Sequence, residues 1–181
     1  MNIKTIIADT HIRIVACSDF QGESGHLKSE ENMLEILYCI EEDGIDEFDA
    51  FFCCGDYDYE YVDSMNGIKS LKSCMSYYVN EEDMVFVQGN HDELVPGEDG
   101  LSPSGNNDPS SDEYGVFVIH EDDYMWYNSD EAIIKNTAYN LQEYLNDKID
   151  KGYTKPIFIL SHLALNYSMR TFNDGDGQYA K

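Results

Sequence analysis

Polar side chains of the kinds that bind metal ions and move protons follow four apolar stretches of this chain. They are, in chain order, Asp19 and Gln21, Asp56, Asn90 and His91, and His162. Carboxylate, amide and imidazole groups without thiolate suit Mn, Fe or Zn ions. A carboxylate shared by two ions about 3.5–4 Å apart stabilises both the attacking and the leaving oxygen of a phosphoryl displacement. The residue types therefore indicate metal-assisted chemistry on a phosphate group, provided that the fold brings them together.

The first half of the chain has the pattern needed to position most of these residues. Apolar runs at 12–17, 48–54 and 84–88 predict three buried strands. A helix is predicted from Ser29 to Gly44, and a weaker helical pattern covers 62–78. This β-α-β-α-β order is typical of a parallel sheet with covered faces. The polar residues would then meet at the carboxyl edge of the sheet, where open α/β sheets bind ligands.

The second half of the chain predicts a long loop and further strands. Residues 96–112 are rich in Gly, Ser, Pro, Asn and Asp, and we interpret them as a loop insertion within one domain. Strands are predicted at 114–120, 124–127 and 156–160, the last of which leads to His162. Between them, a helix capped by Ser129 is predicted to end at Gly152 and to bury a stripe that includes Leu141, Leu145 and Ile149.

Composition narrows the classes of function. The chain has 181 residues and a net charge of −25, so a nucleic-acid binder that uses a basic patch is disfavoured. Five cysteines without a CxxC pair argue against a disulfide framework and favour a reducing compartment. No signal peptide or membrane-spanning run is apparent. We therefore expect one cytoplasmic domain with no membrane partner.

The ordered motifs resemble those of the calcineurin-like metallophosphoesterases. They are Asp19-x-Gln21, Gly55-Asp56, Gly89-Asn90-His91-Asp92 and Ser161-His162. The resemblance extends over residues 12–162 and implies an α/β fold, a sandwich of two mixed β-sheets flanked by helices. It also implies two divalent metal ions (Mn, Fe or Zn) with a bridging hydroxide that attacks a phosphomonoester or phosphodiester.

The same resemblance implies a role for each motif residue. Asp19 would bind the first metal, and Asp56 would bridge both. Asn90 and His162 would bind the second metal. His91 would protonate the leaving oxygen or stabilise charge on the phosphoryl group.

The sequence departs from the family pattern at several points. Gln21 stands where the family usually has histidine, and an amide oxygen is a weaker metal ligand than imidazole. The acid expected three residues after Asp56 is Tyr59. Its candidate substitutes are Asp58, Glu60 and Asp92. No Gly-His-x-His motif occurs before Lys181, so either this chain is the N-terminal portion of a longer protein or the site is incomplete.

Two functions therefore stay open. The first is a metal-dependent hydrolase of a small phosphoester, with a nucleic-acid polymer disfavoured as substrate by the acidic surface. The second is a catalytically inactive fragment or pseudoenzyme that acts as a binding module. His11, His26 and His120 are alternative metal ligands, but a histidine without a metal role is the favoured interpretation of each. A nucleotide-binding protein of another class lacks support, because no glycine-rich phosphate loop occurs.

Overall fold

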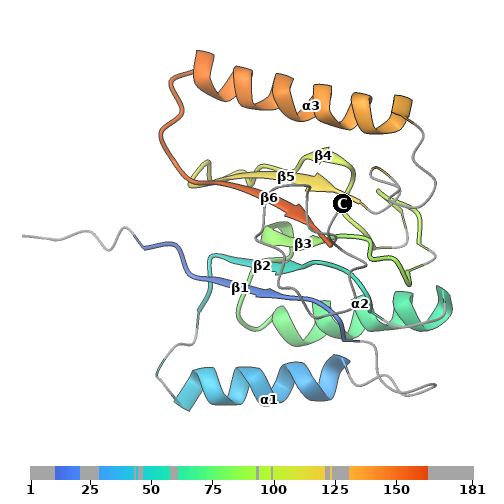
Figure 1. The fold of residues 1–181 in the computed structure, drawn as a ribbon. Helices are drawn as coiled ribbons and strands as arrows, with labels where there is room; N and C mark the ends of the chain where they lie inside the picture. The colour runs from blue at the N-terminus through green and yellow to red at the C-terminus, as the bar shows by residue number, and fades with distance from the viewer. Residues whose placement is uncertain are drawn as a thin grey trace, which may run out of the picture.

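The described part of the chain is a four-layered α/β sandwich. The computed structural model describes residues 11–20, 29–42, 44, 47–57, 61–92, 94–98, 100–120, 123 and 131–162. Within these ranges, two three-stranded sheets lie between two groups of helices. Figure 1 shows α1 and α2 on one side of the paired sheets and α3 on the other. The predicted two-sheet sandwich flanked by helices is confirmed.

The first sheet is parallel and has the order β1-β2-β3. Its strands are β1 (Ile14–Cys17), β2 (Ala50–Cys53) and β3 (Met84–Phe86). The connecting helices are α1 (Ser29–Glu42) and α2 (Tyr61–Met75), and the short 3-10 helix η1 (Glu81–Asp83) precedes β3. This is the β-α-β-α-β unit that the apolar pattern predicts.

Both faces of the central strand β2 are covered. Phe51 and Cys53 pack in a core with α1 and α2, which contribute Met33 and Leu71 among others. Phe52 points the other way, into a core shared with the second sheet. A strand buried on both faces is apolar at every position, which is why β2 reads as an unbroken apolar run.

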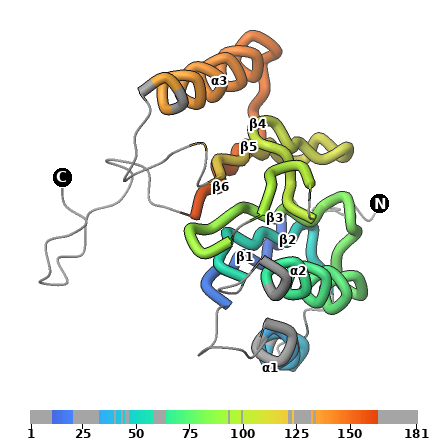
Figure 2. The backbone as a smooth tube through the Cα atoms, turned by 90° about the vertical axis from the view of Figure 1, so that its right-hand side faces the viewer, coloured from blue at the N-terminus to red at the C-terminus, as the bar shows by residue number. Residues whose placement is uncertain are grey.

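The second sheet is mixed and has the order β4-β5-β6. Its strands are β4 (Gly105–Asn106), β5 (Gly115–Ile119) and β6 (Ile157–Ser161), and the helix α3 (Glu131–Asp150) packs on its outer face. β5 and β6 are parallel, whereas β4 is antiparallel to β5. Figure 2 shows α3 on the side of the sheets opposite to α1 and α2.

The second half differs from the sequence prediction in two places. The loop predicted over 96–112 contains the short strand β4. On α3, Ile149 is 72% exposed, while Lys148 is 7% exposed, so the prediction that Ile149 belongs to the buried stripe is wrong. Lys148 is buried in place of Ile149 because its ammonium pairs with the half-buried carboxylate of Asp108 at 2.7 Å. The predicted strand at 124–127 and the predicted cap Ser129 lie outside the described residues.

Two further observations bear on composition. All five cysteines are free thiols. Within the described ranges, no helix combines the length and the apolar character needed to cross a membrane.

Candidate metal centre

The candidate metal ligands follow strands that end on the same side of the sandwich. Asp19 follows β1, Asp56 follows β2 and Asn90 follows β3, whereas His162 follows β6 of the second sheet. The strand arrows of β1, β2, β5 and β6 point to one side in Figure 1. The site is therefore built across the end of both sheets and not along a single sheet.

The side chains of these residues converge. One oxygen of Asp19, one oxygen of Asp56 and one ring nitrogen of His162 all lie within 4.8 Å of one another. The Nε2 atom of His162 is 3.4 Å from Oδ2 of Asp56 and 2.9 Å from Oδ1 of Asn90. Asp56 is only 2% exposed. The structure thus brings together four of the five ligands suggested by the sequence, and Gln21 lies outside the described residues.

The surroundings of the His162 ring fit a bound cation. Its Nδ1 atom lies 2.7 Å from the carbonyl oxygen of Cys54, an acceptor, so Nδ1 carries a proton in that hydrogen bond. A neutral imidazole has one N–H, which leaves a lone pair on Nε2. That lone pair faces the oxygens of Asn90 and Asp56, which also hold lone pairs. The nitrogen and oxygen atoms that converge here are ligands that suit a divalent ion.

The turns that carry the two carboxylates have strained backbone conformations. Asp19 has φ of 60° and Asp56 has φ of 59°, both in the left-handed region that residues other than glycine rarely adopt. The amide of Asp19 donates a hydrogen bond to the carbonyl oxygen of Gly55 at 3.0 Å, which ties the two turns together. Backbone strain of this kind is concentrated at functional sites.

Two glycines allow the second and third turns to pack against each other. A Cβ atom on Gly89 would lie 2.2 Å from Oδ1 of Asp56, and one on Gly55 would lie 2.5 Å from the amide nitrogen of Gly89. Real Cβ atoms do not approach other atoms so closely, so both positions need glycine. The Gly-Asp and Gly-Asn pairs of the sequence are therefore one packed unit.

His91 is attached to the same unit. Its backbone amide donates a hydrogen bond to Oδ1 of Asp56 at 3.1 Å, which helps to fix the direction of that carboxylate. The residue is half-buried, next to the exposed Asn90. The imidazole is thus carried by a turn that contacts the central carboxylate directly.

His120 has a different environment from the site histidine. It is fully buried, its Nδ1 accepts a hydrogen bond from the amide of Gln88 at 2.9 Å, and its Nε2 faces the carbonyl oxygen of Ser102 at 2.9 Å. Both ring nitrogens are occupied by backbone groups, so His120 connects β5 to the chain around β3. His26, Asp58, Tyr59 and Glu60 lie outside the described residues.

Three contacts at the site were not predicted from the sequence, although Asp92 itself was among the candidate acids. The hydroxyl of Ser18 donates a hydrogen bond to the carboxylate of Asp19. The carbonyl of Cys54 orients the His162 ring. The buried carboxylate of Asp92 contacts backbone amides of two turns. Ser18 was identifiable as the neighbour of Asp19, but the other two contacts join segments far apart in the chain.

Burial affects the ionisation of Asp92. Burial raises the pKa of this carboxyl above its ordinary value, and the hydrogen bonds from Gly89, Tyr57, Asp56 and Ser64 oppose that rise without cancelling it.

Cys54 directly follows β2, and its carbonyl contacts His162. The pKa of its thiol is raised to about 11 by burial and by the nearby groups of Cys17 and Asp19. Cys54 is therefore a neutral thiol near neutral pH.

Comparison with known proteins agrees with the geometry. The family model described as calcineurin-like phosphoesterase matches residues 5–179. No curated protein matches the chain, and no solved structure matches it. The matched range includes all the strand ends that form the candidate metal centre.

Proposed function

The chain belongs to the calcineurin-like phosphoesterase family, and we propose that it hydrolyses phosphoester bonds with two bound divalent metal ions. Members of such a family act on phosphoesters with the help of divalent metals. The observation that supports this function for the present chain is the cluster of Asp19, Asp56 and His162, whose ligand atoms lie within 4.8 Å of one another. The oxygen of Asn90 adjoins the same cluster.

Asp56 is placed to hold two ions. Its Oδ2 faces His162 and, through it, Asn90, while Asp19 approaches from the turn after β1. One ion would thus be held by Asp19 with Asp56, and a second by Asp56 with Asn90 and His162. Bound divalent ions would supply Lewis-acid activation of water and of the phosphoryl group. Mn, Fe and Zn all suit these ligands.

The protein's own groups have separate tasks around the ions. The hydrogen bond between Nδ1 of His162 and the carbonyl of Cys54 orients the ring and keeps Nε2 available as a ligand. We assign proton transfer to the leaving oxygen, or stabilisation of phosphoryl charge, to the imidazole of His91. The backbone amide of His91 donates a hydrogen bond to Asp56, which holds the turn that carries this imidazole next to the central carboxylate.

A small phosphoester is the favoured substrate. The net charge of −25 repels polyanions such as nucleic acids. Among the described residues, no lysine or arginine forms an ion pair with Asp19 or Asp56, so the bound ions would carry the positive charge that attracts the phosphate. A substrate with one phosphoryl group meets the least repulsion from the rest of the surface.

The direct test combines metal content with hydrolysis. The purified chain is stripped with a chelator, reloaded separately with Mn²⁺, Zn²⁺ or Fe²⁺, and assayed with p-nitrophenyl phosphate and bis-p-nitrophenyl phosphate. We expect bound metal by elemental analysis and turnover that requires it. Absence of tightly bound metal together with absence of turnover for every ion would overturn the proposal.

A variant at His91 tests the proton-transfer role. His91→Ala should retain wild-type metal content and lose roughly 10²–10⁴-fold in turnover, because a positioned general acid contributes that much. His11→Ala is the matched control, since His11 is an exposed histidine in the segment before β1. Full activity of the His91 variant would exclude the assigned role.

A metal-binding module without catalysis is the second candidate function. It is favoured by Gln21, which stands where the family usually has a histidine ligand. Tight binding of metal ions without hydrolysis of either aryl phosphate would support this function over the first.

A further inference from the structure

We propose that Asp92 is the positioning residue of the metal centre, and that its carboxylate sets the spacing between the turn that carries Asp56 and the turn that carries Asn90. The inference rests on the proposed metal site but concerns a residue that supplies no ligand to it. Asp92 is 4% exposed and accepts hydrogen bonds from the turns that carry Asp56 and Asn90. Its contacts identify its role.

Each oxygen of the Asp92 carboxylate accepts two hydrogen bonds. Oδ2 accepts from the backbone amides of Asp56 and Gly89, each at 2.8 Å. Oδ1 accepts from the amide of Tyr57 at 3.0 Å and from the hydroxyl of Ser64 at 2.9 Å. One side chain therefore joins the turn after β2, the turn after β3 and the first part of α2.

The Oδ2 atom determines how the two ligand turns meet. Because Asp56 and Gly89 donate to the same oxygen, their amides are held next to each other. Asn90 follows Gly89 directly, so the same contact sets the distance between two ligands. The turns are already packed so closely that a Cβ on Gly89 would lie 2.4 Å from the amide nitrogen of Asp56. We call the four hydrogen bonds to the Asp92 carboxylate the clamp. A small change in the clamp therefore changes the distance between the ligand groups of Asp56 and Asn90.

The clamp also stabilises the strained conformation of Asp56. A left-handed conformation is unfavourable for residues other than glycine, so it persists only where surrounding contacts hold it. With φ of 59° at Asp56, the consecutive amides of Asp56 and Tyr57 both point at the Asp92 carboxylate. Consecutive amides in this arrangement form an anion-binding concavity. Here the anion is a side chain of the protein, and it keeps the Asp56 carboxylate directed at the metal position.

Only a carboxylate satisfies all of these contacts. All four partners of Asp92 are donors, and an ionised carboxylate is an acceptor at both oxygens. An asparagine has the same shape but places an NH₂ group against at least one pair of donors. The Asp92→Asn substitution therefore breaks the clamp without opening a cavity.

This role differs from orientation of the catalytic histidine. A carboxylate that acted through His91 would change turnover and its pH profile at saturating metal, with metal affinity unchanged. A carboxylate that positions the ligand turns changes metal affinity first, and turnover recovers when enough metal is added. The two roles are therefore separated by measuring metal affinity and saturated turnover independently.

The experiment measures Mn²⁺ affinity by isothermal titration calorimetry and turnover of bis-p-nitrophenyl phosphate as a function of Mn²⁺. Far-UV circular dichroism and thermal unfolding of the metal-free protein verify that each variant is folded. We expect Asp92→Asn to bind Mn²⁺ about 10–100-fold more weakly, as for loss of an outer-shell partner. Its turnover at saturating Mn²⁺ should approach that of wild type, and its pH profile should be unchanged.

Two further variants complete the design. Ser64→Ala removes one of the four hydrogen bonds and should weaken Mn²⁺ binding about 2–10-fold, the value of a single net hydrogen bond. Asp49→Asn is the matched control, because Asp49 also accepts a hydrogen bond from a backbone amide, that of Arg13, but at the opposite edge of the sheet. It should bind Mn²⁺ like wild type.

The outcomes separate this inference from the function on which it rests. If wild type binds no Mn²⁺, the proposed function fails. If wild type binds Mn²⁺ and a folded Asp92→Asn variant binds it equally well, or loses turnover that saturating Mn²⁺ does not restore, the positioning role is overturned. If Asp92→Asn does not fold, Ser64→Ala decides: unchanged Mn²⁺ affinity would overturn the inference, and weaker affinity would support it.

Discussion

The two ends of the sandwich each hold a carboxylate cluster, and the clusters balance their charge differently. At the carboxyl ends of the strands, the oxygens of Asp19 and Asp56 meet His162. At the start of β5, the carboxylate of Asp108 meets the ammonium of Lys148 at 2.7 Å. The first cluster lacks a lysine or arginine partner within the described residues, whereas the second has one from α3.

The carboxylate of Asp108 has partners supplied by the chain itself. Oδ1 accepts hydrogen bonds from the hydroxyl of Tyr144 at 2.6 Å and from the amide of Val116 at 2.9 Å. The Lys148 ammonium also lies 4.1 Å from the ring centroid of Tyr153, a cation–π distance. Three donors of the chain therefore face this carboxylate, two at Oδ1 and one at Oδ2, and one of them carries a full positive charge.

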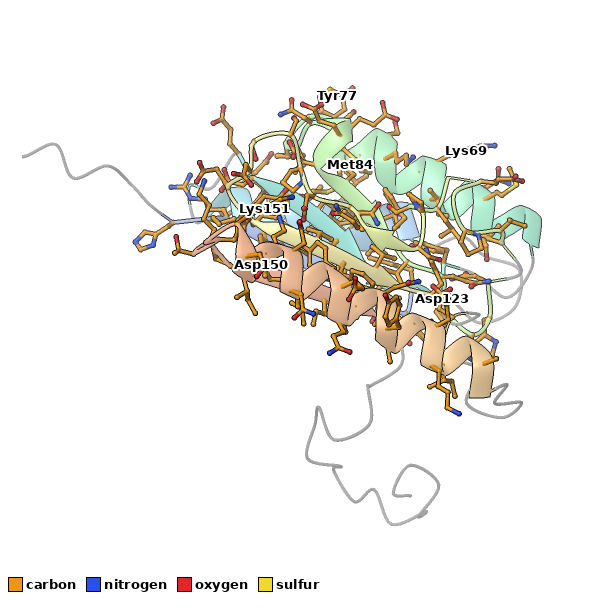
Figure 3. All side chains as sticks on the ribbon, turned by 90° about the horizontal axis from the view of Figure 1, so that it is seen from above. Lys69, Tyr77, Met84, Asp123, Asp150 and Lys151 are labelled. Atoms are coloured by element: carbon orange, nitrogen blue, oxygen red, sulfur yellow. The ribbon has the colours of Figure 1, made fainter. Side chains whose placement is uncertain are left out.

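The position of α3 explains why the second cluster is structural. Figure 3 shows Asp150 and Lys151 at one end of α3 and Asp123, which follows β5, near the other. Lys148 pairs with Asp108, which also contacts Val116 near the start of β5, whereas His162 follows the end of the parallel strand β6. The Asp108 contact ties α3 to the loop before β5, while the ligand cluster faces solvent through Asp19 and Asn90. The two clusters therefore differ in what balances the carboxylate charge: a lysine of α3 pairs with Asp108, whereas among the described residues no lysine or arginine pairs with Asp19 or Asp56.

The largest expected effect contrasts one carboxylate from each cluster. Asp56→Asn should lower metal affinity by more than about 100-fold at both metal positions, beyond the range for an outer-shell partner, because it removes the shared ligand. Asp108→Asn should bind metal like wild type. Calorimetric titration with Mn²⁺ checks both variants, and unchanged metal loading of the Asp56 variant would contradict the bridging role.

A second substitution removes the internal cation. Lys148→Met should lower the free energy of unfolding by roughly 2–3 kcal/mol, since it leaves Asp108 partly buried without its partner. Metal affinity should stay the same. Urea denaturation measures the change, and Lys151→Met is the control because its ion pair with Asp147 is exposed at both ends. Equal stability of the two variants would show that the Asp108 cluster does not stabilise the fold.

The smallest effect is a dependence of stability on pH. Burial raises the pKa of Asp108, but the hydrogen bonds from Lys148, Tyr144 and Val116 outweigh burial, so the pKa lies below its ordinary value. A lowered folded-state pKa stabilises the protein above the ordinary pKa of about 3.9, and this stabilisation is lost as pH falls through the lowered value. Thermal unfolding from pH 6 to pH 2 should therefore show a smaller acid-induced loss for Asp108→Asn than for wild type. If the melting temperatures of wild type and Asp108→Asn fell equally between pH 6 and pH 2, the lowered pKa of Asp108 would be contradicted.

Most of the fold could be predicted from local sequence patterns. The strands β1, β2, β3, β5 and β6 and the three helices occur where apolar runs and helical spacing place them, because burial of a strand or a helix face is visible in neighbouring residues. Gly44, with φ of 80°, follows the end of α1 as predicted. The burial of Lys148 in place of Ile149 was not predictable, since it depends on a carboxylate some forty positions earlier in the chain.

The sequence by itself determined which residues stand at the strand ends, because residue type and the end of an apolar run are local properties. Only the tertiary structure decided which of them meet. The contact of His162 with the carbonyl of Cys54 spans 108 residues, and the hydrogen bond from the Asp56 amide to Asp92 spans 36. Such contacts arise from the packing of two sheets and two glycine turns, which no short stretch of sequence specifies. For that reason the sequence left Asp92 as one of three candidate acids, and only the folded chain shows that its carboxylate joins the turns of Asp56 and Asn90.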